Sequence, residues 1–253
     1  MRGFLSRLLH GPQSAPSPLL NTSPPPPAPE PMSIPRTRSS LQQYMTYYTA
    51  AMALARGSDS RPGLPPELVI HICRLAGFDQ LKEGHSWESP EEDISVYAFD
   101  ASIEAKCWFQ TQPLTNRMLN RIKSIQLSTL SHHQGWVGDP NAGSWSWFDI
   151  SVFRPKEADP TKFEVKILPD GEEASWCSHA HPIDSNSEYK VYKGILFDFD
   201  HPMWKNVDEG DVLVVFLKAR FGAWSNNARH GVLDVKTWWE PSPEMLELMY
   251  RGG

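Results

Sequence analysis

The spacing of β-type segments along the last two thirds of the chain constrains its fold more than any other feature. Segments in which apolar and polar residues alternate, or which are rich in β-branched and aromatic residues, are separated by turns rich in Gly, Pro, Asn and Asp. About eight such segments recur, at residues 94–100, 104–111, 122–130, 145–153, 162–168, 189–199, 211–221 and 231–239. Short strands at this spacing are typical of sandwiches and jelly rolls. We therefore expect a mainly β fold, a jelly-roll antiparallel β-sandwich, over residues 94–253.

Helical patterns flank these segments. Apolar residues recur at helical spacing over residues 39–56, and again over 64–78 between a Pro-Pro start and Gly77. A third helix is expected after Pro241, with Ser242 as its cap and Pro243 at its first position. Three parts follow: a disordered Pro-rich tail over 1–38, a helical segment over 39–93, and a β-sandwich domain with a C-terminal helix over 94–253.

Composition limits the partners and the compartment. The formal net charge is −6, so the chain is poorly suited to releasing phosphate counterions, and we expect no nucleic-acid partner. No apolar run is long enough for a membrane helix, and we expect no membrane partner. The three cysteines are far apart and odd in number, which favours a reducing, cytoplasmic or nuclear compartment. Arg2 and Arg7, with no acidic residue before Glu30, leave a mitochondrial presequence as the alternative.

Two turn-like sequences contain the residue types of a sugar or peptide site. Sugar sites combine aromatic faces for the apolar side of a pyranose with amides or carboxylates for its hydroxyls. The candidate ligand-binding residues are His132, His133, Gln134, Trp136 and Asp139 in the first sequence, and Trp224, Asn226, Asn227, Arg229 and His230 in the second. Asn, Asp and Gly are also ordinary turn formers, and both tryptophans are alternatively core residues.

An H-x-H pair raises the question of metal chemistry. His179 and His181 would project to one face of a strand, as in a cupin-like metal enzyme. However, Glu188 comes too late for the expected glutamate, and residues 178–188 have the composition of a loop. No nucleophile elbow, P-loop, dinucleotide-binding glycine pattern or H-E-x-x-H is present. We expect no cofactor, no metal and no catalytic residue, and keep the metal-dependent cupin-like enzyme as an alternative.

Two stretches carry a resemblance to a known family. Residues 128–150 (STLSHHQGWVGDPNAGSWSWFDI) and 210–235 (GDVLVVFLKARFGAWSNNARHGVLDV) resemble segments of largely uncharacterised fungal proteins with a galactose-binding-like β-sandwich. Their S-x-D-Q-G-W turn has His133 here in place of its aspartate, and the second turn reads FGAW rather than FPGW. The resemblance covers about residues 94–240 and implies a galactose-binding-like sandwich.

The resemblance extends to the helical segment. Many such fungal chains begin with an F-box-like helix, and LPPELVIHICRLAG is similar to the opening of an F-box, although no V-C-x-x-W helix follows. This implies a partner, the Skp adaptor of a cullin ubiquitin ligase, contacted through Leu64, Pro65, Leu68, Ile72 and Leu75. The alternative is that this stripe packs against the chain's own core.

The function expected from the sequence is therefore binding. We expect a non-enzymatic recognition module, a degenerate F-box-type adaptor whose β-sandwich binds a protein or glycan ligand. Besides the cupin-like enzyme, the alternative is a purely structural interaction domain.

Overall fold

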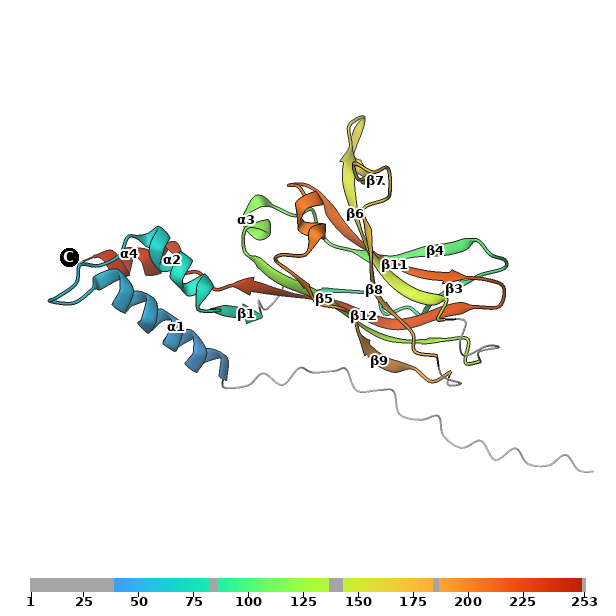
Figure 1. Cartoon of the computed structure of the whole chain (residues 1–253), viewed down its shortest axis with the longest axis horizontal. Helices are drawn as coiled ribbons and strands as arrows, with labels where there is room; N and C mark the ends of the chain where they lie inside the picture. Colours follow the sequence, from blue (N-terminus) through green and yellow to red (C-terminus); the bar gives the residue numbers. More distant parts are fainter. Residues whose placement is uncertain (1–38, 82–85, 137–142, 184–186, 252–253) are drawn as a thin grey trace, which may run out of the picture. The chain divides into compact units, whose positions relative to one another are not determined.

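The computed structural model describes residues 39–81, 86–136, 143–183 and 187–251, and it is mainly β (Figure 1). The predicted tail, 1–38, and the candidate ligand residue Asp139 lie outside the described residues. Two antiparallel sheets enclose one apolar core, to which Leu127 and Leu233 contribute from one sheet and Phe148 and Leu217 from the other. The prediction of an antiparallel β-sandwich is confirmed.

The seven-stranded sheet is built on the long pair β5 and β12. Its strands are β1 (Asp79–Leu81), β2 (Trp87–Glu88), β3 (Ile94–Tyr97), β5 (Ile122–His133), β9 (Lys190–Lys193), β10 (Phe197–Asp198) and β12 (Ser225–Trp238). The β5–β12 register runs from Asn226 opposite His133 to Thr237 opposite Ile122. Both sequences that carry candidate ligand residues are thereby joined by one ladder.

The five-stranded sheet has β11 between β4 and β6. Its strands are β4 (Ile103–Gln110), β6 (Ser146–Lys156), β7 (Asp159–Val165), β8 (Ser175–Ala180) and β11 (Val212–Arg220). The chain passes between the sheets at β3 to β4, β4 to β5, β5 to β6, β8 to β9, β10 to β11 and β11 to β12. This repeated crossing is the connectivity of a jelly roll.

Three sequence predictions were wrong in detail. Residues 189–199 form β9 and β10 rather than one strand, and between them Ile195 N donates to Ser178 O of β8, in the opposite sheet, at 2.9 Å. Residues 225–230, interpreted as a turn, are the start of β12. The segment with His179 was interpreted as a loop, but Ser175–Ala180 is strand β8, paired with β6. In the last two cases, pairing with neighbouring strands outweighs the local preference of polar residues for turns.

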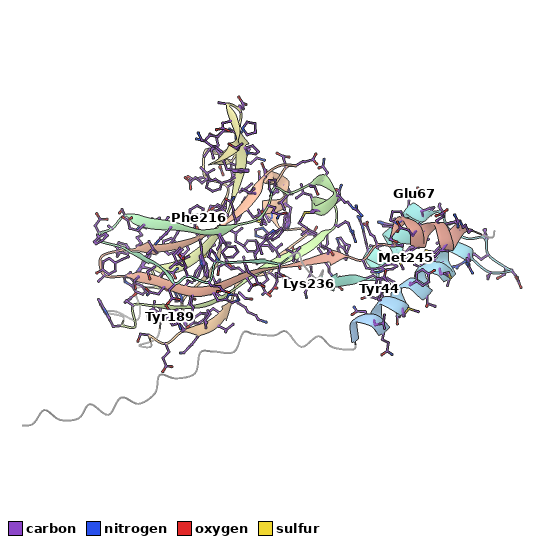
Figure 2. The ribbon with its side chains drawn as sticks, turned by 180° about the vertical axis from the view of Figure 1, so that it is seen from behind. Tyr44, Glu67, Tyr189, Phe216, Lys236 and Met245 are labelled. Carbon is purple, nitrogen blue, oxygen red and sulfur yellow. The ribbon has the colours of Figure 1, made fainter. Side chains whose placement is uncertain are left out.

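A second core gathers the helices around one tryptophan. Helices α1 (Ser39–Arg56), α2 (Pro66–Leu75) and α4 (Pro243–Tyr250) surround Trp239, which is fully buried directly after β12. Tyr44 on α1 and Met245 on α4 are neighbours in Figure 2, with the Tyr44 hydroxyl 3.1 Å from Met245 Sδ. The C-terminal helix thus packs with the two N-terminal ones. Its predicted cap is confirmed, because Met245 N donates to Ser242 Oγ at 3.2 Å.

Two short helices complete the described elements, α3 (Asn116–Leu119) between β4 and β5, and the 3-10 helix η1 (Pro202–Asn206) between β10 and β11. Among the described residues, no helix has both the length and the apolar character needed to cross a membrane.

Candidate functional site

The two predicted ligand sequences meet at one end of the sandwich. His132 and His133 are the last residues of β5, and they pair directly with Asn227 and Asn226 near the start of β12. The sequence therefore identified two segments that are neighbours in space, although about ninety residues separate them along the chain.

Gln134 ties these two segments together beyond the ladder. Its Oε1 accepts from Ser225 N at 3.2 Å, and its Nε2 donates to Trp136 O at 2.7 Å. Gly135 between them has a φ of 89°, and a Cβ there would lie 2.5 Å from Ser187 Cβ, so only glycine fits. The turn after β5 is therefore fixed, and it holds the Trp136 side chain at the surface, 54% exposed.

Aromatic side chains surround this end of the sandwich, and we call Tyr97, Phe99, Trp136, Trp145 and Phe221 the aromatic rim. Tyr97 and Phe99 are in edge contact at 5.1 Å between ring centroids, and Trp145 and Phe221 at 4.6 Å. Phe99 is 79% exposed. Tyr97 and Trp136 are also exposed, whereas Trp145 and Phe221 are half-buried. Exposed large apolar side chains that lie together are a feature of interaction surfaces.

The β11–β12 turn that carries part of the rim is strained. Phe221 and Ala223 have φ values of 66° and 75°, which are unfavourable for residues with a side chain. The turn is held by two backbone hydrogen bonds, Ala223 N to Ala98 O at 3.0 Å and Ala98 N to Trp224 O at 2.9 Å. Strained backbone held in this way is common at ligand sites, where it fixes side chains before binding.

A cation lies among the rim's rings. The Arg220 guanidinium carbon is 4.9 Å from the centre of the Phe221 ring and 5.9 Å from that of Trp145. Arg220 Nε donates to Ala101 O at 2.9 Å. The rim therefore combines ring faces and edges with a fixed guanidinium, the types of group that bind a sugar ring or a peptide.

The structure divides the other predicted ligand residues between surface and interior. Asn226 is fully buried and donates from Nδ2 to Trp147 O at 2.7 Å, so it joins the two sheets. His133 is also buried, 6.0 Å in ring-centroid distance from the half-buried Trp224. Asn226 and His133 therefore face the core. The remaining members His132, Gln134, Asn227 and His230 are half-buried, and Arg229 is exposed.

Arg229 forms an ion pair with a neighbouring aspartate. Its Nε lies 3.0 Å from Asp93 Oδ1, and its guanidinium stands 4.2 Å from the centre of the Tyr189 ring. The hydrogen bond from Arg229 lowers the pKa of Asp93. This exposed cluster lies along β12, two residues beyond Asn227.

Behind the rim, the core between the sheets becomes polar. The inward face of β5 runs Ile125, Leu127, Thr129, Ser131 and His133, all buried. Two histidines of the opposite sheet meet it: His179 Nε2 is 3.0 Å from Thr129 Oγ1, and His181 Nε2 is 3.0 Å from Ser131 Oγ.

The two H-x-H imidazoles share one face, as expected of a strand, and both are held neutral. Burial lowers the pKa of His179 to about 4. Burial, together with repulsion from nearby histidines, lowers that of His181 to about 3. His181 Nδ1 is 2.8 Å from Ser146 Oγ, so both its ring nitrogens bond to hydroxyls. Within the described part of the chain, no three His, Cys, Asp or Glu side chains form a metal-binding group.

The predicted partner stripe on α2 faces water for the most part. Leu75 is 75% exposed and Leu68 48%, while Val69 and Cys73 form the face of α2 that packs in the helical core. Of the remaining members, Pro65 is exposed and Leu64 and Ile72 are half-buried, Leu64 against the helical core. Internal packing, the alternative explanation of the stripe, therefore does not account for Leu68 and Leu75.

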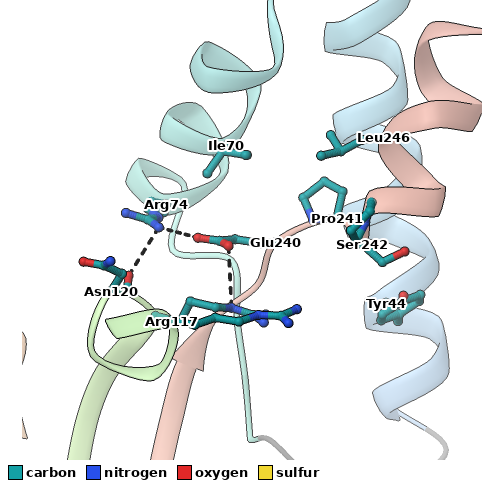
Figure 3. A pocket seen from close by; sticks show the side chains of 11 residues that line it. Tyr44, Ile70, Arg74, Arg117, Asn120, Glu240, Pro241, Ser242 and Leu246 are labelled. Atoms are coloured by element: carbon teal, nitrogen blue, oxygen red, sulfur yellow. Dashed lines mark hydrogen bonds and ion pairs between the residues drawn. The ribbon is translucent and has the colours of Figure 1, made fainter. Parts of the chain in front are cut away.

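A pocket of about 530 Å³ was not anticipated from the sequence (Figure 3). It is lined by Arg74 of α2, Arg117 and Arg121 at the α3–β5 junction, and Glu240 between β12 and α4. Arg117 and Arg121 are four residues apart, but Arg74 and Glu240 are distant from them along the chain, and no motif connects the four. Only the folded arrangement brings them together.

Comparisons with known proteins give no functional assignment. No family model matches the chain, and no curated protein matches it. Two solved structures of infectious bursal disease virus, one of the Gt strain and one of the VP2 subviral particle, match at 8% identity and a TM-score of 0.33. The matches cover 62% and 64% of this chain. This chain spans about a third (34%) of the viral chain in each structure. A likeness this loose carries no argument about function.

Proposed function

We propose that the chain is a non-enzymatic recognition module whose β-sandwich binds a protein or glycan ligand through the aromatic rim. The observation that supports this most is the exposure of Phe99 and Trp136 on turns whose geometry is fixed by hydrogen bonds and by Gly135. Because the backbone of these turns is already fixed, a ligand would lose little binding free energy to ordering it.

The chemistry of the rim suits a flat apolar face that carries hydroxyl or carbonyl groups. Aromatic rings stack on the apolar face of a pyranose or on peptide side chains, and the Arg220 guanidinium is placed beside two of them. The buried histidines and Asn226 lie behind this surface, and their role in the proposal is to support it from within.

A glycan array and a set of purified candidate peptides test the ligand. The full-length protein is compared with Trp136→Ala and Phe99→Ala, and with Phe199→Ala as the control, because Phe199 is a 51% exposed phenylalanine that is not part of the rim. The rim variants should lose binding at unchanged melting temperature, and the control should keep it. Binding that survives in both rim variants would exclude the rim.

For residues 64–77, which include α2, we propose an adaptor role with the Skp adaptor of a cullin ligase as partner. Two observations support it: the resemblance of residues 64–77 to the start of an F-box, and the exposure of Leu68 and Leu75. Leu75→Glu should abolish co-purification with purified Skp adaptor. Leu248→Glu on α4, a 53% exposed leucine, is the control and should not. Absence of any complex with the unmodified chain would refute this role.

A further inference from the structure

The pocket of Figure 3 collects positive charge in an acidic protein. Three guanidinium groups, those of Arg74, Arg117 and Arg121, share a lining in which Glu240 is the one carboxylate. The local charge of the lining is therefore +2, whereas the whole chain carries −6. A local reversal of sign in a concave site concentrates anions there.

The pairing inside the pocket leaves donors unused. Glu240 bonds to Arg74 Nη2 and lies 3.6 Å from Arg121 Nε, which is too long for a hydrogen bond. Arg74 Nη2 also donates to Asn120 O at 3.3 Å. The Nε atoms of Arg74 and Arg121 are buried, and neither has a hydrogen-bond partner among the described residues. Because both Nε atoms are closed to solvent, a ligand in the pocket would have to meet the other N–H groups of these side chains.

Arg117 carries a charge that no other group among the described residues balances. It lines the pocket from α3, its side chain is exposed, and within the described residues it forms no ion pair or hydrogen bond. Whereas Arg74 and Arg121 share Glu240 and so have a structural role, Arg117 has no such role. Its charge is therefore available to an anion in the pocket.

An adjoining cavity of about 330 Å³ shares Arg117 and Arg121 with the first. Its other walls are mainly apolar, with Met118, Ile122 and Val235. Thr237 also lines it, and this side chain is buried with a hydroxyl that has no hydrogen-bond partner among the described residues. The cationic pocket thus adjoins a smaller, mainly apolar compartment whose lining also includes Thr115 and Thr237.

We propose that these two cavities bind a phosphate monoester, with the phosphate between the three arginines and the esterified group beside Met118 and Val235. A phosphate dianion matches the local charge of +2, and its oxygens accept the paired N–H donors that guanidinium groups present. A carboxylate would neutralise only half of that charge. The proposal is independent of the rim and of the α2 stripe.

The test uses the full-length protein and isothermal titration at fixed ionic strength. The probes are phenyl phosphate, a peptide with a phosphorylated tyrosine, the same peptide without phosphate, and acetate. Both phosphorylated probes should bind more tightly than acetate and the plain peptide. A tighter fit of phenyl phosphate would indicate a free small molecule as the natural ligand, and a tighter fit of the phosphopeptide a modified protein.

Arg117→Gln is the decisive variant because it removes a charge without removing a structural contact. Loss of one charge-assisted contact should weaken binding of the phosphorylated probes about tenfold or more. Arg154→Gln removes an exposed arginine on β6 together with its ion pair to Glu164, and as the charge control it should bind as the unmodified chain does. The proposal is overturned if neither phosphorylated probe binds, or if Arg117→Gln binds them unchanged.

Glu240→Gln separates the site from a purely structural clasp. If the pocket takes a dianion, removal of the competing carboxylate raises the local charge to +3 and should tighten binding of phenyl phosphate. Because Glu240 also bonds to Arg74, the variant should lower the melting temperature in either case, so the affinity decides. An affinity for phenyl phosphate that is unchanged or weaker would count against the proposal.

Discussion

The side-chain amide of Asn226 on β12 donates a 2.7 Å hydrogen bond to the backbone carbonyl of Trp147 on β6, in the opposite sheet. This contact crosses the sandwich where the two sequence motifs meet. Asn226 itself is fully buried. Asn226, which the sequence suggests as a ligand residue, thus links the two sheets instead. It also fixes the position of the β11–β12 turn, which carries part of the aromatic rim.

Asn226→Ala should therefore reduce stability. Loss of a buried hydrogen bond, which also leaves a carbonyl without this donor, costs about 1–3 kcal/mol. Asn227→Ala is the matched control, because Asn227 is only half-buried and bonds to nearby side chains such as Ser225. Urea denaturation monitored by tryptophan fluorescence gives both free energies of unfolding. Equal values for the two variants would argue against the inter-sheet role of Asn226.

The buried histidines should make stability depend on pH in a defined window. With pKa values of about 4 and 3 when folded, His179 and His181 stay neutral down to pH values at which the unfolded chain, with an ordinary pKa of 6.5, binds protons. Unfolding is therefore favoured as pH falls below 6.5. Each histidine contributes a slope of about 1.4 kcal/mol per pH unit. Above pH 6.5 these groups contribute no change.

Urea denaturation between pH 7 and 4.5 measures this slope, since carboxylates with lowered pKa values act mainly below about pH 4. The double variant His179→Gln, His181→Gln keeps hydrogen-bonding groups but cannot bind the protons. Its slope in this window should be flatter. An unchanged slope would mean that these two histidines do not remain neutral in the folded state.

Trp239 should be the residue on which the helical core depends most. It is fully buried and meets the rings of Tyr44, Tyr47 and Phe78. Trp239→Ala should cost about 3–5 kcal/mol, because it removes a large buried side chain and leaves a cavity. Trp238→Ala, at a half-buried position beneath Lys123, should cost about 1 kcal/mol. Similar losses for the two variants, measured by far-UV circular dichroism in urea, would contradict this assignment.

One property of these two tryptophans follows from strand alternation alone, which places neighbouring side chains on opposite sides. In the structure Trp239 lies in the helical core, whereas Trp238 is half-buried. The helix cap at Ser242 was likewise predictable from the preferences of neighbouring residues alone. Residues 225–230 were misinterpreted because asparagine prefers turns, and only pairing with β5 and β3 makes this segment a strand.

Burial and distant convergence could not be predicted from the chain alone. Whether His133 faces the core or the solvent depends on the opposite sheet, where His181 lies 6.0 Å from it between ring centroids. The arginines of the pocket come from segments more than forty residues apart, at Arg74 and Arg117, and no spacing rule connects them.

The most direct test of the account compares what two variants of the full-length protein capture from native lysate, with bound proteins and glycans identified by mass spectrometry. One variant alters the rim, Phe99→Ala with Trp136→Ala, and the other alters α2, Leu68→Glu with Leu75→Glu. The account predicts that the rim variant loses the ligand and keeps the Skp adaptor, and that the α2 variant does the reverse. A rim variant that captures the same ligands as the unmodified protein would contradict the account.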